Sequence, residues 1–387
     1  MVKQIRSLIG CLIGRMKNER GMALLATMLA IALMTIIVVD FTSSSAMGYL
    51  SAANHANEVR AEYLARSGIN VGLALLAQDT RNQQTQQISS GGGVSAQNQP
   101  ADSFMSVWAL PFPPMPVNGG TVQLAVVDEA RKFDINKLVV GTLPTPSNGI
   151  QTNGTESSNT EGTDQNSGAG TTVGQGSQSV GQSTTNGAQL QMGQIDPNAV
   201  AQLQRLFALL NIPLDIVPAI VDWLDRDSIE SQGGAEADYY MRLIPPYEPR
   251  NGPMPTLGDL RLVKGVNDAI FMKLRNYLTV APEGQVNINT APPEVIACLE
   301  QQLANDPGVV QKIIQQRQIA PFTNIGDVGN IVGSSLPSNK LTQDLTTRGQ
   351  YFTISGMGAF AGTRKLAFAT FHRNGDGTAT LSSWQED

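Results

Sequence analysis

The residues best suited to chemistry are acids gathered in DRDSIESQGGAEADYY, residues 225–240. Calcium takes about six to eight oxygen ligands, often from a flexible loop in which glycine allows tight turns. A D-x-D pair and acids returning beyond the paired glycines could supply them. The spacing is not that of an EF-hand, and a solvated acidic loop capping a helix is an equally good interpretation. The acids are Asp225, Asp227, Glu230, Glu236 and Asp238.

Residue types that serve catalysis are otherwise scarce. The two histidines, His55 and His372, lack a motif that would supply partners for a Ser-His-Asp or zinc arrangement. Of the two cysteines, Cys298 lies in a predicted helix and is expected to be a small buried apolar residue. No G-x-x-x-x-G-K-[ST] phosphate loop occurs. We therefore expect no enzyme, and the net charge of −6 argues against a nucleic-acid surface.

The first forty residues predict a membrane anchor. Residues 1–21 carry five Lys or Arg and a single acid, whereas no charged residue occurs from Met22 to Val39 before Asp40 ends the run. A helix over these 18 residues rises about 27 Å, close to the thickness of a bilayer core. Because basic residues hold their end in the cytoplasm, we expect a single-pass protein whose remaining chain is exported.

The helical pattern continues beyond Asp40, unlike the sequence after an ordinary secretory signal. No proline occurs between Met1 and Gln99, so we expect one helix of more than fifty residues that ends near Asp79, before an irregular loop. A plain single-span anchor is the simpler alternative. The stripe expected to face the protein is Ala56, Val59, Tyr63, Val71 and Leu75.

Later sequences predict a small antiparallel sheet. Strands are expected at Ser103–Leu110, at Thr121–Asp128, and in YFTISGMGAF and RKLAFATFHRN, which flank a glycine turn. DEARKFDINKL, residues 128–138, predicts a turn that leads into a short helix. A long helix followed by antiparallel strands predicts an α+β fold.

Two further regions interrupt that pattern. From about Thr145 to Gln194 the chain is almost entirely Gly, Ser, Thr, Asn and Gln, which predicts disorder or, alternatively, a glycan-decorated or partner-binding tether. Ile195–Tyr277 predicts short packed helices, the first begun by Asp196-Pro197 as N-cap and first helical residue. VNINTAPPEVI and the 32 residues after it, to GDV, predict paired helices that resemble helix-hairpin-helix modules.

Arg20-Gly21 followed by Met22-Ala-Leu-Leu resembles the cleavage site of type IV prepilins. The resemblance implies cleavage between Gly21 and Met22, and N-methylation of Met22. Most pilins carry a glutamate five residues after the cut, which faces the ammonium terminus of the subunit above, since a membrane carboxylate is costly unless paired. This chain has Ala26 there. Ala26 therefore points to a minor, tip-type pseudopilin that needs no such partner.

DWLDRD, GAEADYY, PPYEPRN, LRLVKGV and VNINTAPPEVI, in that order, resemble type II secretion system protein K. The resemblance implies a type IV pilin-like α+β head with an inserted all-α domain of helix-hairpin-helix or SAM-like units. It also favours calcium, with Asp225, Asp227, Glu236 and Asp238 as ligands and Asp222 facing the helices or capping. The expected parts are a leader (1–21), a first head segment (22–143), a disordered insertion (144–194), the helical domain (195–345) and closing strands (346–387).

That resemblance implies a minor pseudopilin in the inner membrane, with a cytoplasmic N-terminus and a periplasmic bulk. It would stand at the tip of the pseudopilus and help to initiate its assembly for protein export. Its partners would be I- and J-type minor pseudopilins, the inner-membrane secretion platform and the prepilin peptidase. One alternative is an assembly protein of a type IV pilus system.

Another alternative is a membrane-tethered helix-hairpin-helix protein that binds DNA. Such hairpins carry a glycine-rich turn whose N–H groups approach phosphate. Here the turn is NDPGVV, with one glycine beside an acid, and the nearby basic side chains are Lys312 and Arg317. The segment is better suited to a structural or protein-binding role, and we expect no nucleic-acid partner.

Overall fold

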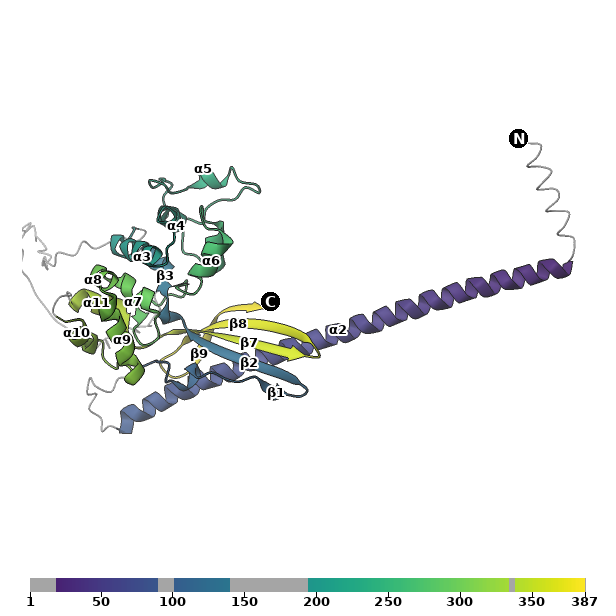
Figure 1. Ribbon diagram of the computed structural model, residues 1–387, viewed down its shortest axis with the longest axis horizontal. Helices are drawn as coiled ribbons and strands as arrows, with labels where there is room; N and C mark the ends of the chain where they lie inside the picture. Colours follow the sequence, from purple (N-terminus) through teal and green to yellow (C-terminus); the bar gives the residue numbers. More distant parts are fainter. Residues whose placement is uncertain (1–18, 90–100, 140–193, 334–337, 387) are drawn as a thin grey trace, which may run out of the picture. The chain divides into compact units, whose positions relative to one another are not determined.

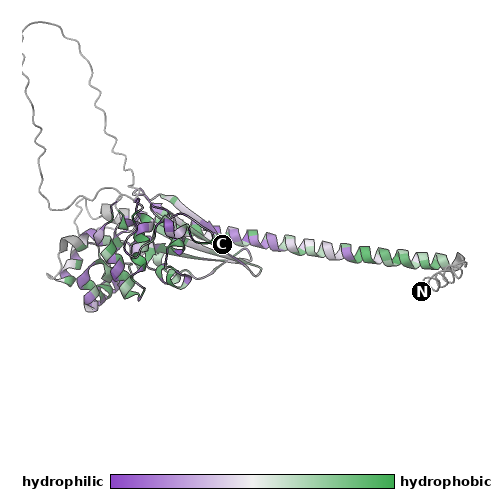
Figure 2. Cartoon of the chain, turned by 90° about the horizontal axis from the view of Figure 1, so that it is seen from above, coloured by the Kyte–Doolittle hydropathy of each residue, from purple (hydrophilic) through white to green (hydrophobic). Residues whose placement is uncertain are grey.

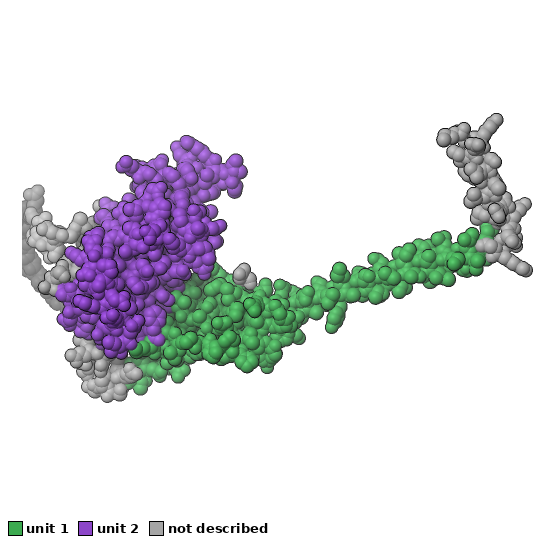
Figure 3. All heavy atoms as spheres, viewed as in Figure 1, with its two compact units in different colours: residues 1–89, 105–127, 352–387 green, residues 90–104, 128–351 purple. Residues whose placement is uncertain are grey.

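The computed structural model describes residues 19–89, 101–139, 194–333 and 338–386. They belong to two compact units, each assembled from distant parts of the chain (Figure 3). Unit 1 comprises residues 1–89, 105–127 and 352–387, and unit 2 comprises residues 90–104 and 128–351. Residues 1–18 of the expected leader and 144–193 of the expected insertion lie outside the described residues.

The N-terminal helix α2 runs from Glu19 to Ser89 (Figure 1). Among the described residues it is the one helix long and apolar enough to cross a membrane, and its apolar part lies toward its N-terminus (Figure 2). The apolar side chains from Met22 to Val39 are exposed along it. Thr27 and Thr35 donate their hydroxyls to carbonyls one turn earlier, as a polar side chain in lipid requires.

Helix α2 ends about ten residues later than the sequence predicts. The expected loop after Asp79 is helical to Ser89. The Arg and Gln residues of this segment are good helix formers, and no glycine occurs between Asp79 and Gly91. The side chains of Arg81 and Thr85 also donate to carbonyls one turn back. Polarity alone was therefore a poor signal for the end of the helix.

Unit 1 contains a five-stranded sheet in the order β1-β2-β7-β8-β9 (Figure 1). The strands expected over β2, β7 and β8 are confirmed, whereas β1 and β9 were not foreseen. Strand β9 pairs antiparallel with β8, with a register shift between Thr370 and Phe371. The bounds are β1 Met115–Val117, β2 Gly120–Asp128, β7 Tyr351–Phe360, β8 Thr363–Arg373 and β9 Ala379–Glu386.

The face of α2 that packs on the sheet is made mostly of small residues, and of the predicted stripe only Leu75 packs against this core. Tyr63 is 65% exposed and Val71 is 40% exposed. At Gly358 and Gly356 of β7, a Cβ would collide with backbone carbonyls of α2. The helix and the sheet meet backbone to backbone, which large side chains would prevent. The buried α2 residues there are Ala61, Ala65, Gly68, Ile69, Gly72 and Leu76.

The strand expected at Ser103–Leu110 is also wrong. A short 3-10 helix, η1 (Val107–Ala109), forms there instead. It buries Trp108, whose ring meets that of Phe352 edge to face at a centroid distance of 5.1 Å. Burial of this single aromatic side chain, rather than an alternating pattern, fixes the segment in unit 1.

Unit 2 is mainly helical and matches the expected packing of short helices. Asp196 caps α3 by accepting hydrogen bonds from the N–H groups of Asn198 and Ala199, as predicted. Its helices are α3 Pro197–Leu209, α4 Ile216–Leu224, α5 Ala237–Tyr240, α6 Asp268–Leu274, α7 Pro293–Leu299, α8 Gln301–Asn305, α9 Pro307–Ile319, α10 Gly326–Val332 and α11 Ser338–Asp344, with 3-10 helices η2 Glu129–Arg131, η3 Ile135–Leu138 and η4 Leu257–Leu262.

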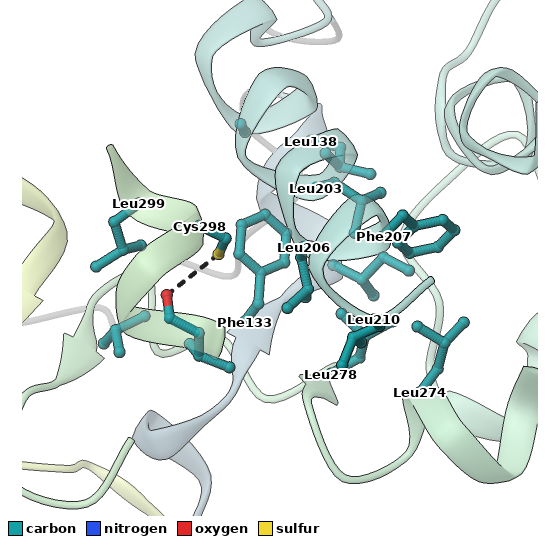
Figure 4. Close-up of a cluster of buried hydrophobic side chains, with 14 of the residues drawn as sticks. Phe133, Leu138, Leu203, Leu206, Phe207, Leu210, Leu274, Leu278, Cys298 and Leu299 are labelled. Atoms are coloured by element: carbon teal, nitrogen blue, oxygen red, sulfur yellow. Dashed lines mark hydrogen bonds between the residues drawn. The ribbon is translucent and has the colours of Figure 1, made fainter. Parts of the chain in front are cut away.

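The core of unit 2 forms where α3 and α7 meet residues 133–138 (Figure 4). Phe133, Leu203 and Leu206 are fully buried there, together with Cys298. The Cys298 thiol donates to the carbonyl of Val295, and burial raises its pKa to about 12. Cys298 is therefore the inert, buried residue that its surroundings in the sequence predicted.

Unit 2 includes residues before the expected boundary at 143 and continues to 351, beyond the one expected at 345. The insertion expected to end at 194 lies almost wholly outside the described residues. Residues 128–139 belong to unit 2, because β3 (Phe133–Asp134) pairs in parallel with β4 (Leu278–Thr279). A second parallel pair joins β5 (Val286–Asn287) to β6 (Leu345–Thr346). These two-residue ladders are too short to recognise in a sequence. The first of them joins DEARKFDINKL to the helical unit rather than to the five-stranded sheet.

Candidate metal centre

Three acids of the 225–240 loop face one another. One carboxylate oxygen from each of Asp225, Asp227 and Glu236 lies within 4.8 Å of those of the other two. Asp225 directly follows the last residue of α4, and Glu236 directly precedes the first residue of α5. The two helix ends therefore hold two of the carboxylates, and the intervening loop returns between them.

Asp222, on the last turn of α4, shapes that loop. Its side chain is fully buried and accepts hydrogen bonds from the N–H groups of Ser231, at 3.1 Å, and Ala235, at 2.8 Å. A Cβ at Gly234 would collide with the Asp222 carboxylate, so the loop can close over Asp222 only with glycine at that position. Of the two roles expected for Asp222, the inward-facing one is observed, and its hydrogen bonds hold the loop rather than cap a helix.

The facing carboxylates are buried and lack hydrogen-bond partners. Asp225 is 3% exposed and Glu236 is 5% exposed. Within the described residues, Oδ1 of Asp225 and both Oε atoms of Glu236 have no hydrogen-bond partner. A buried polar atom without a partner costs free energy, and native proteins contain few of them. These oxygens are therefore available to a ligand that can accept their electron pairs.

The electrostatics of the group also favour a cation. Burial raises the pKa of Asp225 to about 7, and the charges of Asp227, Asp222 and Glu236 add to the rise. Burial raises the pKa of Glu236, and the charges of Asp222 and Asp227 add to the rise. Carboxylates forced together resist ionisation, and a divalent cation would relieve their repulsion.

The fourth predicted ligand, Asp238, lies outside this group. It is exposed in the first turn of α5, and the group of three facing acids does not include it. The prediction included Asp238 because it took every acid after the paired glycines to turn back toward Asp225. The short helix α5 begins at Ala237 and carries Asp238 to the surface.

Asn251 is a neighbour that sequence reasoning missed. Its Nδ2 donates to the carbonyl of Asp227 at 3.0 Å, and its Oδ1 is buried without a partner among the described residues. Its φ of +46° lies in the left-handed region, which asparagine tolerates better than most residues. The signal that could have found it was the PPYEPRN motif, in which Asn251 is the last residue.

These residues fit calcium chemically. Asp225, Asp227 and Glu236 offer hard, anionic oxygen atoms, which calcium prefers to nitrogen or sulfur ligands. Calcium also accepts backbone carbonyls, and Gly233, with φ of +88°, lets the loop turn beside the acids. The group contains neither histidine nor cysteine, so it does not resemble a zinc site.

The helix-hairpin-helix-like segment uses its polar groups internally. Asp306 caps α9 by accepting from the N–H of Gly308. Arg317 donates through Nη1 to the carbonyls of Ile288 and Ala291, at 2.7 Å each. A carboxylate at the helix N-terminus would repel phosphate. The contacts therefore support the structural interpretation of this segment.

The comparisons with known proteins settle the family. Two family models described as type II secretion system (T2SS), protein K match residues 132–283 and 286–348, which together make more than half of the chain. The chain belongs to the type II secretion system protein K family. Both matches lie inside unit 2, so the motifs that mark a protein K are mostly those of the helical unit.

Individual relatives agree with this assignment. The type II secretion system protein K of Pseudomonas aeruginosa is 23% identical over 369 residues, which are 93% of this chain and 91% of the relative. The protein K of Aeromonas hydrophila is 39% identical over 89 residues, 22% of this chain and 27% of the relative.

A solved structure has the same fold. The crystal structure of the GspK–GspI–GspJ complex from the enterotoxigenic Escherichia coli type 2 secretion system matches with a TM-score of 0.51 at 15% identity, covering 89% of this chain and 99% of the matched chain. The predicted protein K family and α+β fold, a long helix and an antiparallel sheet with added helices, are confirmed.

Proposed function

We propose that this protein K works as a minor pseudopilin at the tip of the periplasmic pseudopilus of a type II secretion system. It helps to initiate the filament and assembles there with I- and J-type minor pseudopilins. Three observations support the proposal: the family assignment, the exposed apolar part of α2, and a matched structure that is itself a complex of GspK with GspI and GspJ. Its role is assembly rather than catalysis.

Processing and topology follow from the N-terminal sequence. Prepilin peptidase cleaves between Gly21 and Met22 and methylates Met22, and the basic residues before the cut keep that end cytoplasmic. The new N-terminus then begins the apolar part of α2, which stays in the inner membrane. Cleavage removes five basic residues and one acid, so that 21 basic and 31 acidic residues remain, a net charge of −10.

The tip position rests on Ala26 and on unit 2. Ala26 offers no carboxylate to the ammonium terminus of a subunit above. Unit 2 spans 128–351, larger than the rest of the exported chain, and subunits of that bulk do not repeat easily along a tightly packed filament.

Reconstitution tests the partners. We expect the full chain, co-expressed with the I- and J-type pseudopilins of its own secretion system, to purify with both in detergent. It should also restore secretion to a strain that lacks its protein K. Purification of the chain alone, with restored secretion, would contradict the proposed complex while leaving the family assignment intact.

The acidic group of unit 2 binds one calcium ion, through Asp225, Asp227 and Glu236. The support is geometric, since three carboxylates converge and three of their buried oxygens lack hydrogen-bond partners within the described residues. Calorimetric titration of the full chain should show calcium binding that the Asp225→Ala/Asp227→Ala variant lacks. Asp238→Ala is the matched control and should bind as the wild type does. Equal binding by the double variant would remove the site.

A further inference from the structure

Two arginines of unit 2 share one aromatic ring. The guanidinium carbon of Arg131 lies 5.7 Å from the ring centroid of Phe104, and that of Arg317 lies 5.9 Å from it. We call Phe104, Arg131 and Arg317 the arginine cluster. Arg131 is the last residue of η2, Arg317 lies in the last turn of α9, and Phe104 precedes both in a loop. Three separate segments of unit 2 therefore converge here.

Among the residues that the structure describes, no acid balances the charge of Arg131. No hydrogen bond or ion pair joins it to any residue that the structure describes, and its Nε is buried without a partner. Arg317 is held in place by its Nη1 hydrogen bonds to two carbonyls, which carry no net charge. Burial, and after it the charge of Arg131, lowers the pKa of Arg317 to about 10. The pair is therefore positively charged, partly buried and uncompensated.

The nearby acids are engaged elsewhere. Glu129 accepts from Lys132 at 3.0 Å and from the hydroxyl of Thr279 at 2.6 Å. Asp128 accepts from Asn287 and Thr290, so it too has partners. Residues 90–100, which lie close to Phe104 in the sequence, include neither Asp nor Glu. The described acids therefore supply no counter-charge for the arginine cluster, which leaves another polypeptide, an ion from solution or the acids within residues 144–194 as its source.

We propose that the arginine cluster is a docking site for an acidic side chain, Asp or Glu, of a partner polypeptide. Arginine is well suited to this because its planar donors match a carboxylate in two-point hydrogen bonding. Phe104 is 49% exposed and offers an apolar contact that a free anion would not use. Arginine and aromatic residues are enriched at the energetic centres of interfaces. The inference goes beyond the proposed function and does not depend on the calcium site.

Site-specific crosslinking tests the proposal in cells. Phe104 is replaced by the photoreactive p-benzoylphenylalanine, which keeps an aromatic ring beside the arginines, and the crosslinked peptide is identified by mass spectrometry. We expect a peptide of another protein with Asp or Glu within a few residues of the crosslink. Arg131→Glu should lower the crosslink yield about tenfold or more, as expected for a charge reversal at the centre of an interface. Replacement of the partner's acid by arginine should restore it.

Folding and specificity are controlled within the same experiment. In the Arg131→Glu variant the new carboxylate can pair with Arg317, so the fold should persist, and its thermal unfolding is compared with that of the wild type. Arg242→Glu, at an exposed arginine of the same unit outside the acidic group, should leave the yield unchanged. Arg131→Gln, which removes the charge without reversing it, should give an intermediate yield.

Three results would overturn the proposal. The first is a crosslink yield that Arg131→Glu does not change. The second is a crosslink to residues 144–194 of the same chain, which would make the occupant internal. The third is a rise in the unfolding temperature of the purified full chain with sulfate that requires Arg131, in the absence of any crosslink to another protein, because the site would then take a free oxyanion.

Discussion

At the scale of single residues, the site depends on which carboxylates are buried together. Asp222 and Asp225 lie three residues apart and have different roles, one structural and one as a candidate metal ligand. Asp222 has its oxygens occupied by backbone N–H groups, whereas Asp225 has an oxygen without a partner among the described residues. A carboxylate that accepts hydrogen bonds from backbone N–H groups holds the loop in place, whereas a carboxylate oxygen without a donor is available to bind a metal ion.

The raised pKa of Asp225 predicts that the effect of calcium on stability depends on pH. Its value of about 7 lies above that of an unfolded aspartate, about 3.9. The folded state then binds more protons than the unfolded state between these values, so without metal Asp225 lowers stability as pH rises from about 4 to 7. Calcium competes with that proton. The calcium-induced rise in unfolding temperature should therefore be large at pH 8 and small at pH 5.

Asp225→Asn serves as the control for this pH series. Asp128 and Asp134 also have pKa values of about 7, raised mainly by burial, and they titrate in both proteins. The difference between the wild type and the variant therefore isolates Asp225. A calcium-induced rise that is equal at pH 5 and pH 8 would contradict ionisation of this group on binding.

The close approach of Gly234 to Asp222 predicts that the 225–240 loop closes only with glycine at position 234. Gly234→Ala places a Cβ against the Asp222 carboxylate and should cost about 2 kcal/mol or more of unfolding free energy. Gly252→Ala, in a loop of the same unit with room for a Cβ, should change stability by less than about 0.5 kcal/mol. Denaturant titrations of the two variants provide the measurement, and equal stability would refute the described closure.

At the scale of elements, α2 meets the sheet through small residues. Gly358→Ala would place a Cβ against the backbone of α2 at Ala61, and it should destabilise unit 1 by about 2 kcal/mol. Gly375→Ala, just after β8, adds a Cβ that has no heavy atom within 4 Å, and it is the matched control. Limited proteolysis of the strands in unit 1 should be faster in the first variant. Equal rates in both would argue against the close approach of the helix to the sheet.

How far the sequence predicted these elements depended on the kind of signal. The 18 uncharged residues before Asp40 and the alternation in β7 and β8 are strong local patterns. The helix and the two strands that they predicted are present. The buried face of α2 was not, because a stripe of Ala and Gly is invisible to a search for large apolar residues. The two-residue ladder of β3 with β4 is non-local, and Asp238 was misplaced because α5 could not be foreseen.

At the scale of the molecule, the two units carry different parts of the function. Unit 1 holds the membrane-spanning candidate and the sheet, whereas unit 2 holds the acidic site, the arginine cluster and both family matches. Motifs that identify the family therefore lie apart from the segment that would anchor it. A pseudopilin stem is, in this chain, joined to a unit large enough to carry its own binding surfaces.

This division predicts where calcium acts. Hydrogen exchange measured on the full chain should slow in residues 222–240 when calcium is added, because the ion ties the ends of α4 and α5 together. Residues 351–373, the strands β7 and β8 of unit 1, should exchange at unchanged rates. Protection confined to the strands would place the ion elsewhere.

A minor pseudopilin requires an α2 stem that is released from its leader to pack with other subunits. The most direct measurement is the intact mass of the protein purified from membranes of cells that contain prepilin peptidase. We predict a chain that begins at an N-methylated Met22. A chain that retains residues 1–21 would contradict the assignment of a pseudopilin stem and leave only a simple membrane anchor.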